Sequence, residues 1–341
     1  MYGWLQNAKQ LLRRGSAWML ALALCGAMGA GAVELNREDD ASRMLVPVGH
    51  TVGIKLFAKG VLVVKLPEDN TPAKECGLRE GDVILSCAGS TVTSTEQFQS
   101  LLQKTDGEVT DLQVHRNGVT MHFSVDPEAN EQGVYCIGAW IRDSMAGIGT
   151  MTYYDPETGE FGALGHGITD VDTAQLMPFS SGSILPSTVK AVNKGESGCA
   201  GELRGDFDLS CDLGDLYANT DCGVFGTLDE TAEALSAGEA VPIGTAKMGK
   251  AVIRSNVQGN TVKEYEIEIL NVISESSDGR DMVLSVTDPE LISVTGGIVQ
   301  GMSGCPILQD GKLVGAVTHV LLNDAKKGYG ISIETMLNAG K

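Results

Sequence analysis

Apolar and polar residues alternate in short runs along most of the chain, a pattern typical of β-strands separated by turns. Only residues 94–104, 229–237 and 333–337 read as helices. After residue 126, apolar runs are separated by Gly, Asp, Asn and Ser. The strands expected there are 147–154, 161–166, 183–192, 223–226, 245–253, 264–272 and 282–286. The pattern therefore predicts a mainly β protein.

Residues 45–126 form the first predicted folded segment. In its helix, Phe98, Leu101 and Leu102 have the i, i+3, i+4 spacing of one apolar face, and Ser94 or Thr95 is the expected N-cap. Two strands follow, joined by Asn117–Gly118, a strong signal for a two-residue hairpin. The segment is thus expected to be a small β-rich module with one helix.

The polar stretch 126–131 is the best domain boundary, because turn-forming residues cluster there. The second segment, residues 127–341, carries many closely spaced strands over roughly 200 residues. This spacing predicts an all-β barrel or a pair of barrels.

Residues 1–34 differ from the rest in composition. Lys9, Arg13 and Arg14 precede an uncharged run, 15–33, that ends in small residues. This order is typical of a secretory signal peptide. The run also approaches the length that spans a bilayer, so a membrane anchor is the alternative. Either interpretation predicts a secreted or membrane-anchored, extracytoplasmic protein.

Composition limits the classes of partner and cofactor. The chain is 43% hydrophobic and 20% charged, as in a soluble globular protein, and its net charge of −19 disfavours nucleic acid as a partner. Its eight cysteines show no C-x-x-C spacing, and no histidine lies near Cys199, Cys211 and Cys222. We therefore expect no metal and no cofactor. Those three cysteines form either a disulfide or, as we favour, free thiols.

The stretch from 296 to 307 is a glycine-rich turn between apolar β-branched runs, with Ser303 at its centre. Glycines on both sides permit backbone angles that expose a hydroxyl and point successive N–H groups at one spot. Acyl-transfer enzymes need such a spot to stabilise an oxyanion. Ser303 is therefore a candidate nucleophile.

A serine nucleophile needs a base, and the base needs an orienting group. Of the five histidines, His166 is the best candidate, because it ends a predicted strand between two glycines. Asp288 lies at a strand end fifteen positions before Ser303, while Asp170 and Asp172 are close to His166 in sequence. The residues alone leave the choice of acid open.

The first module resembles a PDZ domain. The residues that carry this likeness are the Ala-x-x-x-Gly-Leu-x-x-Gly-Asp-Val-Ile stretch at 73–84 and the following Gly89. The resemblance implies that peptide tails bind a carboxylate-binding loop and add as a strand to an open sheet edge. That loop would be Gly53, Ile54, Lys55 and Leu56, although it lacks the usual aromatic last residue.

Nearly the whole chain resembles the stage IV sporulation protein B (SpoIVB) serine peptidases. The motifs are Phe-Gly-Ala-Leu-Gly-His-Gly-Ile at 161–168, Gly-Gly-Ile-Val-Gln-Gly-Met-Ser-Gly-Cys-Pro-Ile at 296–307, Gly-Ala-Val-Thr-His-Val at 315–320 and Gly-Tyr-Gly-Ile at 328–331. The resemblance implies a PDZ-like module followed by a chymotrypsin-like double β-barrel. It implies that His166 is the general base, Asp288 its orienting acid and Ser303 the nucleophile. The oxyanion hole would be the N–H groups of Gly301 and Ser303.

The resemblance also implies a signalling role in sporulation. Such a peptidase acts in the forespore intermembrane space, cleaves itself and then cuts a membrane-associated regulatory protein, so that a late sigma factor becomes active. The alternative is a non-catalytic extracytoplasmic adaptor that binds protein tails through its PDZ-like module. A zinc hydrolase is disfavoured, because the chain lacks an H-E-x-x-H motif.

Overall fold

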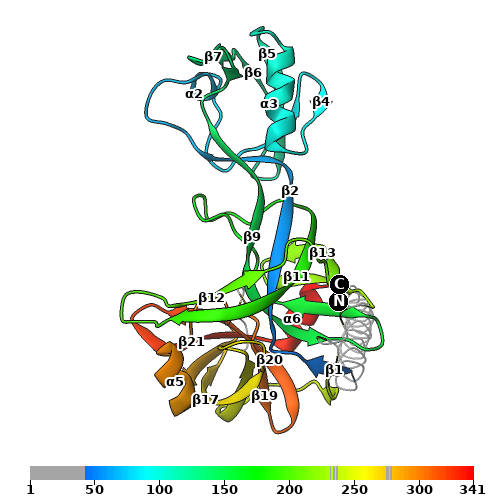
Figure 1. Cartoon of the computed structure of the whole chain (residues 1–341), viewed down its shortest axis with the longest axis vertical. Helices are drawn as coiled ribbons and strands as arrows, with labels where there is room; N and C mark the ends of the chain where they lie inside the picture. Colours follow the sequence, from blue (N-terminus) through cyan, green and yellow to red (C-terminus); the bar gives the residue numbers. More distant parts are fainter. Residues whose placement is uncertain (1–42, 231, 233–234, 236, 274–275, 277–278) are drawn as a thin grey trace, which may run out of the picture. The chain divides into compact units, whose positions relative to one another are not determined.

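Strands dominate the computed structural model (Figure 1), which describes all residues except 1–42, 231, 233–234, 236, 274–275 and 277–278. The predicted signal or anchor segment, 1–34, and part of the predicted helix 229–237 lie outside the described residues. Among the described residues, no helix is both long and apolar enough to cross a membrane.

A ring of six strands forms the first barrel. Consecutive antiparallel pairings join β2 to β9, β9 to β10, β10 to β14, β14 to β13, β13 to β11 and β11 back to β2. The ring strands are β2 (Thr51–Lys65), β9 (Trp140–Tyr154), β10 (Glu160–Ala163), β11 (Phe179–Asn193), β13 (Gly214–Thr220) and β14 (Gly223–Leu228). Strands β1 (Met44–Pro47), β12 (Glu202–Phe207) and β15 (Val241–Pro242) extend its sheet.

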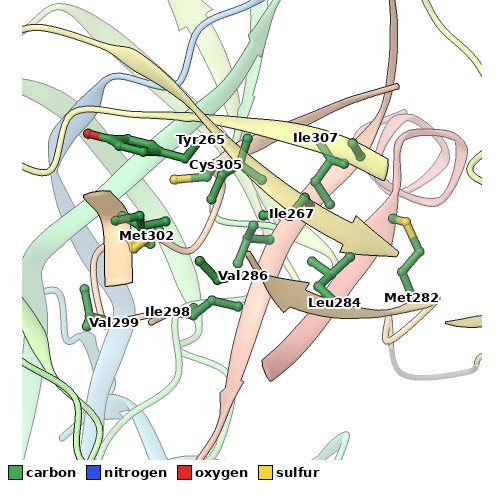
Figure 2. Packing of buried hydrophobic residues seen from close by; sticks show 14 of the residues in the cluster. Tyr265, Ile267, Met282, Leu284, Val286, Ile298, Val299, Met302, Cys305 and Ile307 are labelled. Atoms are coloured by element: carbon green, nitrogen blue, oxygen red, sulfur yellow. The ribbon is translucent and has the colours of Figure 1, made fainter. Parts of the chain in front are cut away.

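The second barrel is closed by β16 (Gly249–Ser255), β17 (Lys263–Val272), β18 (Met282–Val286), β21 (Asp324–Ser332), β20 (Lys312–Leu321) and β19 (Pro306–Gln309). Alternate residues of its strands point inward, as the period of two requires. Figure 2 shows Ile267, Leu284, Val286 and Ile307 meeting in this core, and each is at least 97% buried. The two rings confirm the predicted pair of barrels.

The PDZ-like module lies between β2 and β9 in sequence. It contains α2 (Pro72–Glu75), β3 (Val83–Cys87), β4 (Ser90–Thr91), α3 (Thr95–Lys104), β5 (Thr110–Arg116) and β6 (Val119–Val125), and β7 (Glu128–Ala129) pairs with β8 (Tyr135–Cys136) after it. The predicted helix and hairpin are confirmed. Ser94 caps α3, and Asn117 and Gly118 both have positive φ, as a type I′ turn requires.

The module begins and ends differently from the predicted range 45–126. The first half of β2, up to Ala58, pairs with barrel strands β11 and β9, while Val61 and Leu62 pair with β3 of the module. The start of β9, residues 140–142, pairs with the second half of β2. Two long strands therefore run through both the module and the first barrel.

Two further helices follow the barrel strands. Helix α6 (Ile333–Ala339) confirms the predicted C-terminal helix, and Ser332 caps it. Helix α5 (Pro289–Thr295) was not predicted. Its cap is Asp288, and Pro289 occupies the first helical turn, where its fixed φ and missing N–H cost nothing.

Candidate active site

Strand β9 holds the glycine-rich turn that carries Ser303. The Thr150 N–H donates to the Ser303 carbonyl (3.0 Å), the Thr150 hydroxyl donates to the Gly301 carbonyl (2.7 Å), and the Thr152 hydroxyl donates to the Gly304 carbonyl (2.8 Å). Gly304 has a φ of +96°, and a Cβ there would lie 2.0 Å from the Thr150 carbonyl oxygen. Only glycine allows this close approach of the turn to the strand.

The backbone N–H groups from Gly301 to Cys305 differ in their hydrogen-bond partners. Those of Met302, Gly304 and Cys305 donate to backbone carbonyls. Among the described residues, no hydrogen bond is recorded from the N–H of Gly301 or Ser303, the two groups predicted to form the oxyanion hole. The turn thus leaves unpaired the donors that a tetrahedral intermediate would require.

Two residues with left-handed backbone angles, Leu164 (φ +69°) and Gly165 (φ +68°), connect the end of β10 to His166. Its Nδ1 lies 2.8 Å from the Gly167 carbonyl oxygen, which fixes the proton on Nδ1 and leaves the Nε2 lone pair free. Burial lowers the pKa of His166 and outweighs the opposite effect of the Gly167 carbonyl. The ring is therefore neutral near pH 7, as a general base must be.

His166 and Ser303 line the same cleft, which has a volume of about 470 Å³. The Ser303 hydroxyl donates to the Thr318 carbonyl (2.7 Å), so a rotation about one side-chain bond is needed to turn it toward an acceptor in the cleft. His319 also lines the cleft, with its ring centroid 5.1 Å from that of His166. Sequence reasoning chose His166 alone among the five histidines and so missed this second ring.

The structure does not bring Asp288 to this cleft. One carboxylate oxygen accepts the Leu291 N–H (2.9 Å) at the start of α5, and the other accepts the Glu266 N–H (3.3 Å). Asp288 is also absent from the residues that line the cleft. The residue implied as the orienting acid is a helix cap in this structure, and the Gly167 carbonyl occupies the orienting position on the His166 ring.

Asp288→Asn is therefore expected to change kcat less than about two-fold, because asparagine caps helices as well as aspartate does. Asp288→Ala should lower the free energy of unfolding by about 1 kcal/mol. Peptide hydrolysis and thermal unfolding of both variants test this. A fall in kcat of about 10⁴-fold in folded Asp288→Asn would instead identify Asp288 as the orienting acid.

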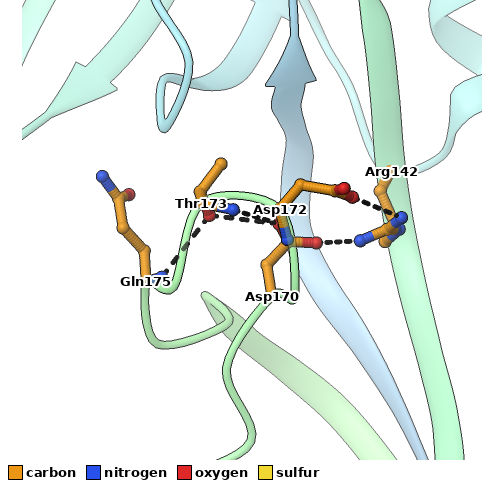
Figure 3. Close-up of polar contacts among 5 residues, drawn as sticks. All are labelled: Arg142, Asp170, Asp172, Thr173 and Gln175. Carbon is orange, nitrogen blue, oxygen red and sulfur yellow. Dashed lines mark hydrogen bonds and ion pairs between the residues drawn. The ribbon is translucent and has the colours of Figure 1, made fainter.

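Asp170 and Asp172, the other two candidates for the orienting acid, form hydrogen bonds and ion pairs that stabilise a turn (Figure 3). Asp170 is fully buried and accepts from the N–H groups of Asp172 and Thr173, while Arg142 forms ion pairs with both aspartates. Burial acts to raise the pKa of Asp170, but the two N–H groups and Arg142 together lower it. Neither aspartate lines the cleft.

The predicted peptide-binding residues, Gly53, Ile54, Lys55 and Leu56, lie in the first half of β2. That half pairs with β11 on one edge and β9 on the other. No edge remains for an added strand, so this segment is a barrel strand and the prediction was wrong. The reason is long-range pairing, which the local sequence does not reveal.

A separate groove of about 260 Å³ lies between α3 and the segment 136–141. Its walls include Phe98, Gln99 and Leu102 of the helix. The side-chain amides of Gln99 and Gln103 donate to the Tyr135 carbonyl, which directly precedes the groove-lining segment 136–141. At 140–142, one edge of β9 pairs with β2, and among the described residues no strand pairs with the other edge.

All seven described cysteines are free thiols. Cys305, two residues after Ser303, is fully buried, and burial raises its pKa to about 11. The thiol is therefore protonated at neutral pH and is not a nucleophile. Within the described residues, no cluster of three or more His, Cys, Asp or Glu side chains could hold a metal ion.

The family model of SpoIVB peptidase S55 matches residues 133–337, more than half of the chain, and a PDZ domain model matches residues 63–116. The chain is 33% identical over 116 residues to the regulator of sigma-W protease RasP of Bacillus subtilis. The matched region is 33% of this chain and 25% of RasP. It is 36% identical over 72 residues to the serine protease HTRA1 of Xenopus tropicalis. The matched region is 21% of this chain and 15% of HTRA1. The chain thus spans a quarter or less of each relative.

Among solved structures, the chain is similar to the active form of the Rv3671c protease from Mycobacterium tuberculosis. The sequence identity is 14% and the TM-score is 0.32, and the match covers 57% of this chain and 74% of that chain. It is also similar to the PDZ domain of the SdrC-like protein from Listeria monocytogenes, with 20% identity and a TM-score of 0.23 over 24% of this chain and 87% of that chain.

Proposed function

This chain belongs to the SpoIVB peptidase S55 family and is a serine peptidase with a PDZ domain, and we propose that Ser303 is its nucleophile and His166 its general base. The observation that carries this proposal is the shared cleft, which is lined both by a half-buried, neutral imidazole and by the hydroxyl of a turn that leaves two N–H groups unpaired. His166 takes the hydroxyl proton as Ser303 attacks the peptide carbonyl, and then donates it to the leaving amine. The N–H groups of Gly301 and Ser303 stabilise the oxyanion.

We further propose that the peptidase acts outside the cytoplasm in sporulation, in the forespore intermembrane space, where it cleaves itself and then a membrane-associated regulatory protein. Activation of a late sigma factor would follow. Family membership supports this role, and so does the basic and apolar start of the chain. The N-terminal sequence of the mature protein, determined by mass spectrometry with and without an active Ser303, tests the self-cleavage step.

Labelling with a fluorophosphonate probe separates a peptidase from the alternative, a non-catalytic adaptor. The proposal expects one adduct on Ser303, because the probe reacts only with a serine that a base activates. The peptide map of labelled, folded protein identifies the modified residue. Absence of an adduct in protein with a cooperative thermal transition would favour the adaptor.

We propose that peptide tails bind the groove between α3 and residues 136–141 rather than the predicted loop. The unpaired edge of β9 supports this, because it offers N–H and C=O groups to an added strand. The apolar walls would take the last side chain of the tail. Trp140 borders the groove and is 67% exposed, so it can be changed without cost to the core.

Trp140→Ala is therefore expected to weaken binding of a fluorescent peptide with an apolar last residue by about ten-fold, the loss typical of one aromatic contact. Amidation of the peptide's carboxyl end should weaken binding as well. Fluorescence polarisation measures both effects, and Lys55→Ala, in the originally predicted loop, is the control. Weakening by Lys55→Ala but not by Trp140→Ala would contradict the proposed groove.

A further inference from the structure

We propose that the ion pair between Arg142 and Asp170 sets the distance between the two reacting side chains, so that Arg142 is a positioning residue of the peptidase. Figure 3 shows the guanidinium bridging Asp170 and Asp172. This inference rests on the proposed roles of His166 and Ser303, since it concerns the parts of the structure that carry them.

On one side of the pair, Arg142 lies in β9. The same strand holds the nucleophile turn eight residues later, where Thr150 donates to the carbonyls of Ser303 and Gly301. Between these two points, residues 145–148 line the catalytic cleft. A displacement of β9 at Arg142 would therefore move both a wall of the cleft and the support of Ser303.

On the other side, Asp170 closes the loop that carries His166. Its N–H donates to the Gln175 carbonyl, and its Oδ1 accepts from the N–H groups of Asp172 and Thr173. The two arms of the loop lie side by side, because Thr169 forms an antiparallel bridge with Leu176 and the Met177 N–H donates to the Ile168 carbonyl. The turn is thus a closed unit, fixed at its tip by one buried carboxylate.

This closed loop sets the direction of the Gly167 carbonyl, which holds the His166 ring. A Cβ on Gly167 would lie 2.3 Å from Leu176 Cδ1 and 2.6 Å from the Thr220 carbonyl oxygen, so the Gly167 backbone packs closely against both residues. The next residue, Ile168, donates from its N–H to the Asn219 side chain (2.8 Å). The chain of contacts therefore runs from Arg142 through Asp170 to the atom that orients the base.

The Arg142→Lys variant is expected to lower kcat by about 10- to 100-fold while KM changes less than about three-fold, because a small misplacement of reacting groups costs about that factor in rate. Lysine keeps the charge but cannot bridge both aspartates in the same plane. The rate of fluorophosphonate labelling at Ser303 should fall with kcat. A role in folding alone would lower the thermal midpoint without this loss in kcat at temperatures where the protein is folded.

Arg142→Gln removes the partner of a buried carboxylate and can unfold the loop. The double variant Arg142→Gln/Asp170→Asn restores neutrality, so we expect it to fold but to keep the low kcat. Arg254→Gln is the matched control, because Arg254 is equally exposed (28% against 30%) and pairs with Glu264. A folded double variant and a folded Arg142→Lys with kcat within two-fold of wild type would overturn the proposal. If wild-type protein is not labelled at Ser303, the proposed function fails instead.

Discussion

Ser303→Ala is expected to lower kcat for peptide hydrolysis by roughly 10⁶-fold, the scale of loss when a serine nucleophile is removed. The same change should abolish fluorophosphonate labelling and the proposed self-cleavage, because each requires the activated hydroxyl. The fold should persist, since the hydroxyl makes one hydrogen bond, to the Thr318 carbonyl, worth about 1 kcal/mol.

Hydrolysis of a fluorogenic peptide and the mass of the mature chain are the measurements. Ser181→Ala is the matched control, because Ser181 is an exposed serine of β11 outside the cleft. Activity near wild type in folded Ser303→Ala would reject Ser303 as the nucleophile and with it the assigned oxyanion hole.

His166→Ala should cost nearly as much as the loss of Ser303, because base and nucleophile act as one unit. His122→Gln, which changes an exposed histidine of β6, should leave kcat within two-fold of wild type. If the kcat of His166→Ala stays far above that of Ser303→Ala, another residue acts as the base for Ser303. His319 would then be the next residue to test, since its ring lies 5.1 Å from that of His166.

The pH profile provides a second test of His166. The base works only when it is neutral, so kcat/KM falls as the pH drops through the pKa of His166. Burial holds this pKa below the usual value of about 6.5. We therefore expect the acidic half-point of kcat/KM below pH 6.5. A half-point above 6.5 would mean that a nearby acid stabilises the charged ring, contrary to the observed contacts.

Local signals in the sequence predicted local structure well. Ser94 caps α3, Asn117–Gly118 turns the hairpin, and the glycines around Ser303 form the turn with free N–H groups. Each of these depends on neighbouring residues and on intrinsic backbone preferences. The proposed nucleophile and base were singled out for the same reason, since both lie next to glycines.

Long-range pairing and side-chain direction could not be predicted in this way. The first half of β2 joins β11, more than a hundred residues away, and no local pattern records that choice. Spacing placed Asp288 near Ser303 in sequence but gave no direction for its carboxylate. One signal for its true position was present, because Asp followed by Pro and Glu is typical of a helix start.

Strand β9 borders both of the proposed binding sites: its start borders the α3 groove, and its middle lines the cleft that contains Ser303. Thermodynamic linkage makes any influence between two such sites mutual. If a peptide bound in the groove raises the affinity for substrate by some factor, a bound substrate raises the affinity of the groove for that peptide by the same factor. An inhibitor locked onto Ser303 would thus report the size of that influence through the affinity of a tail peptide alone.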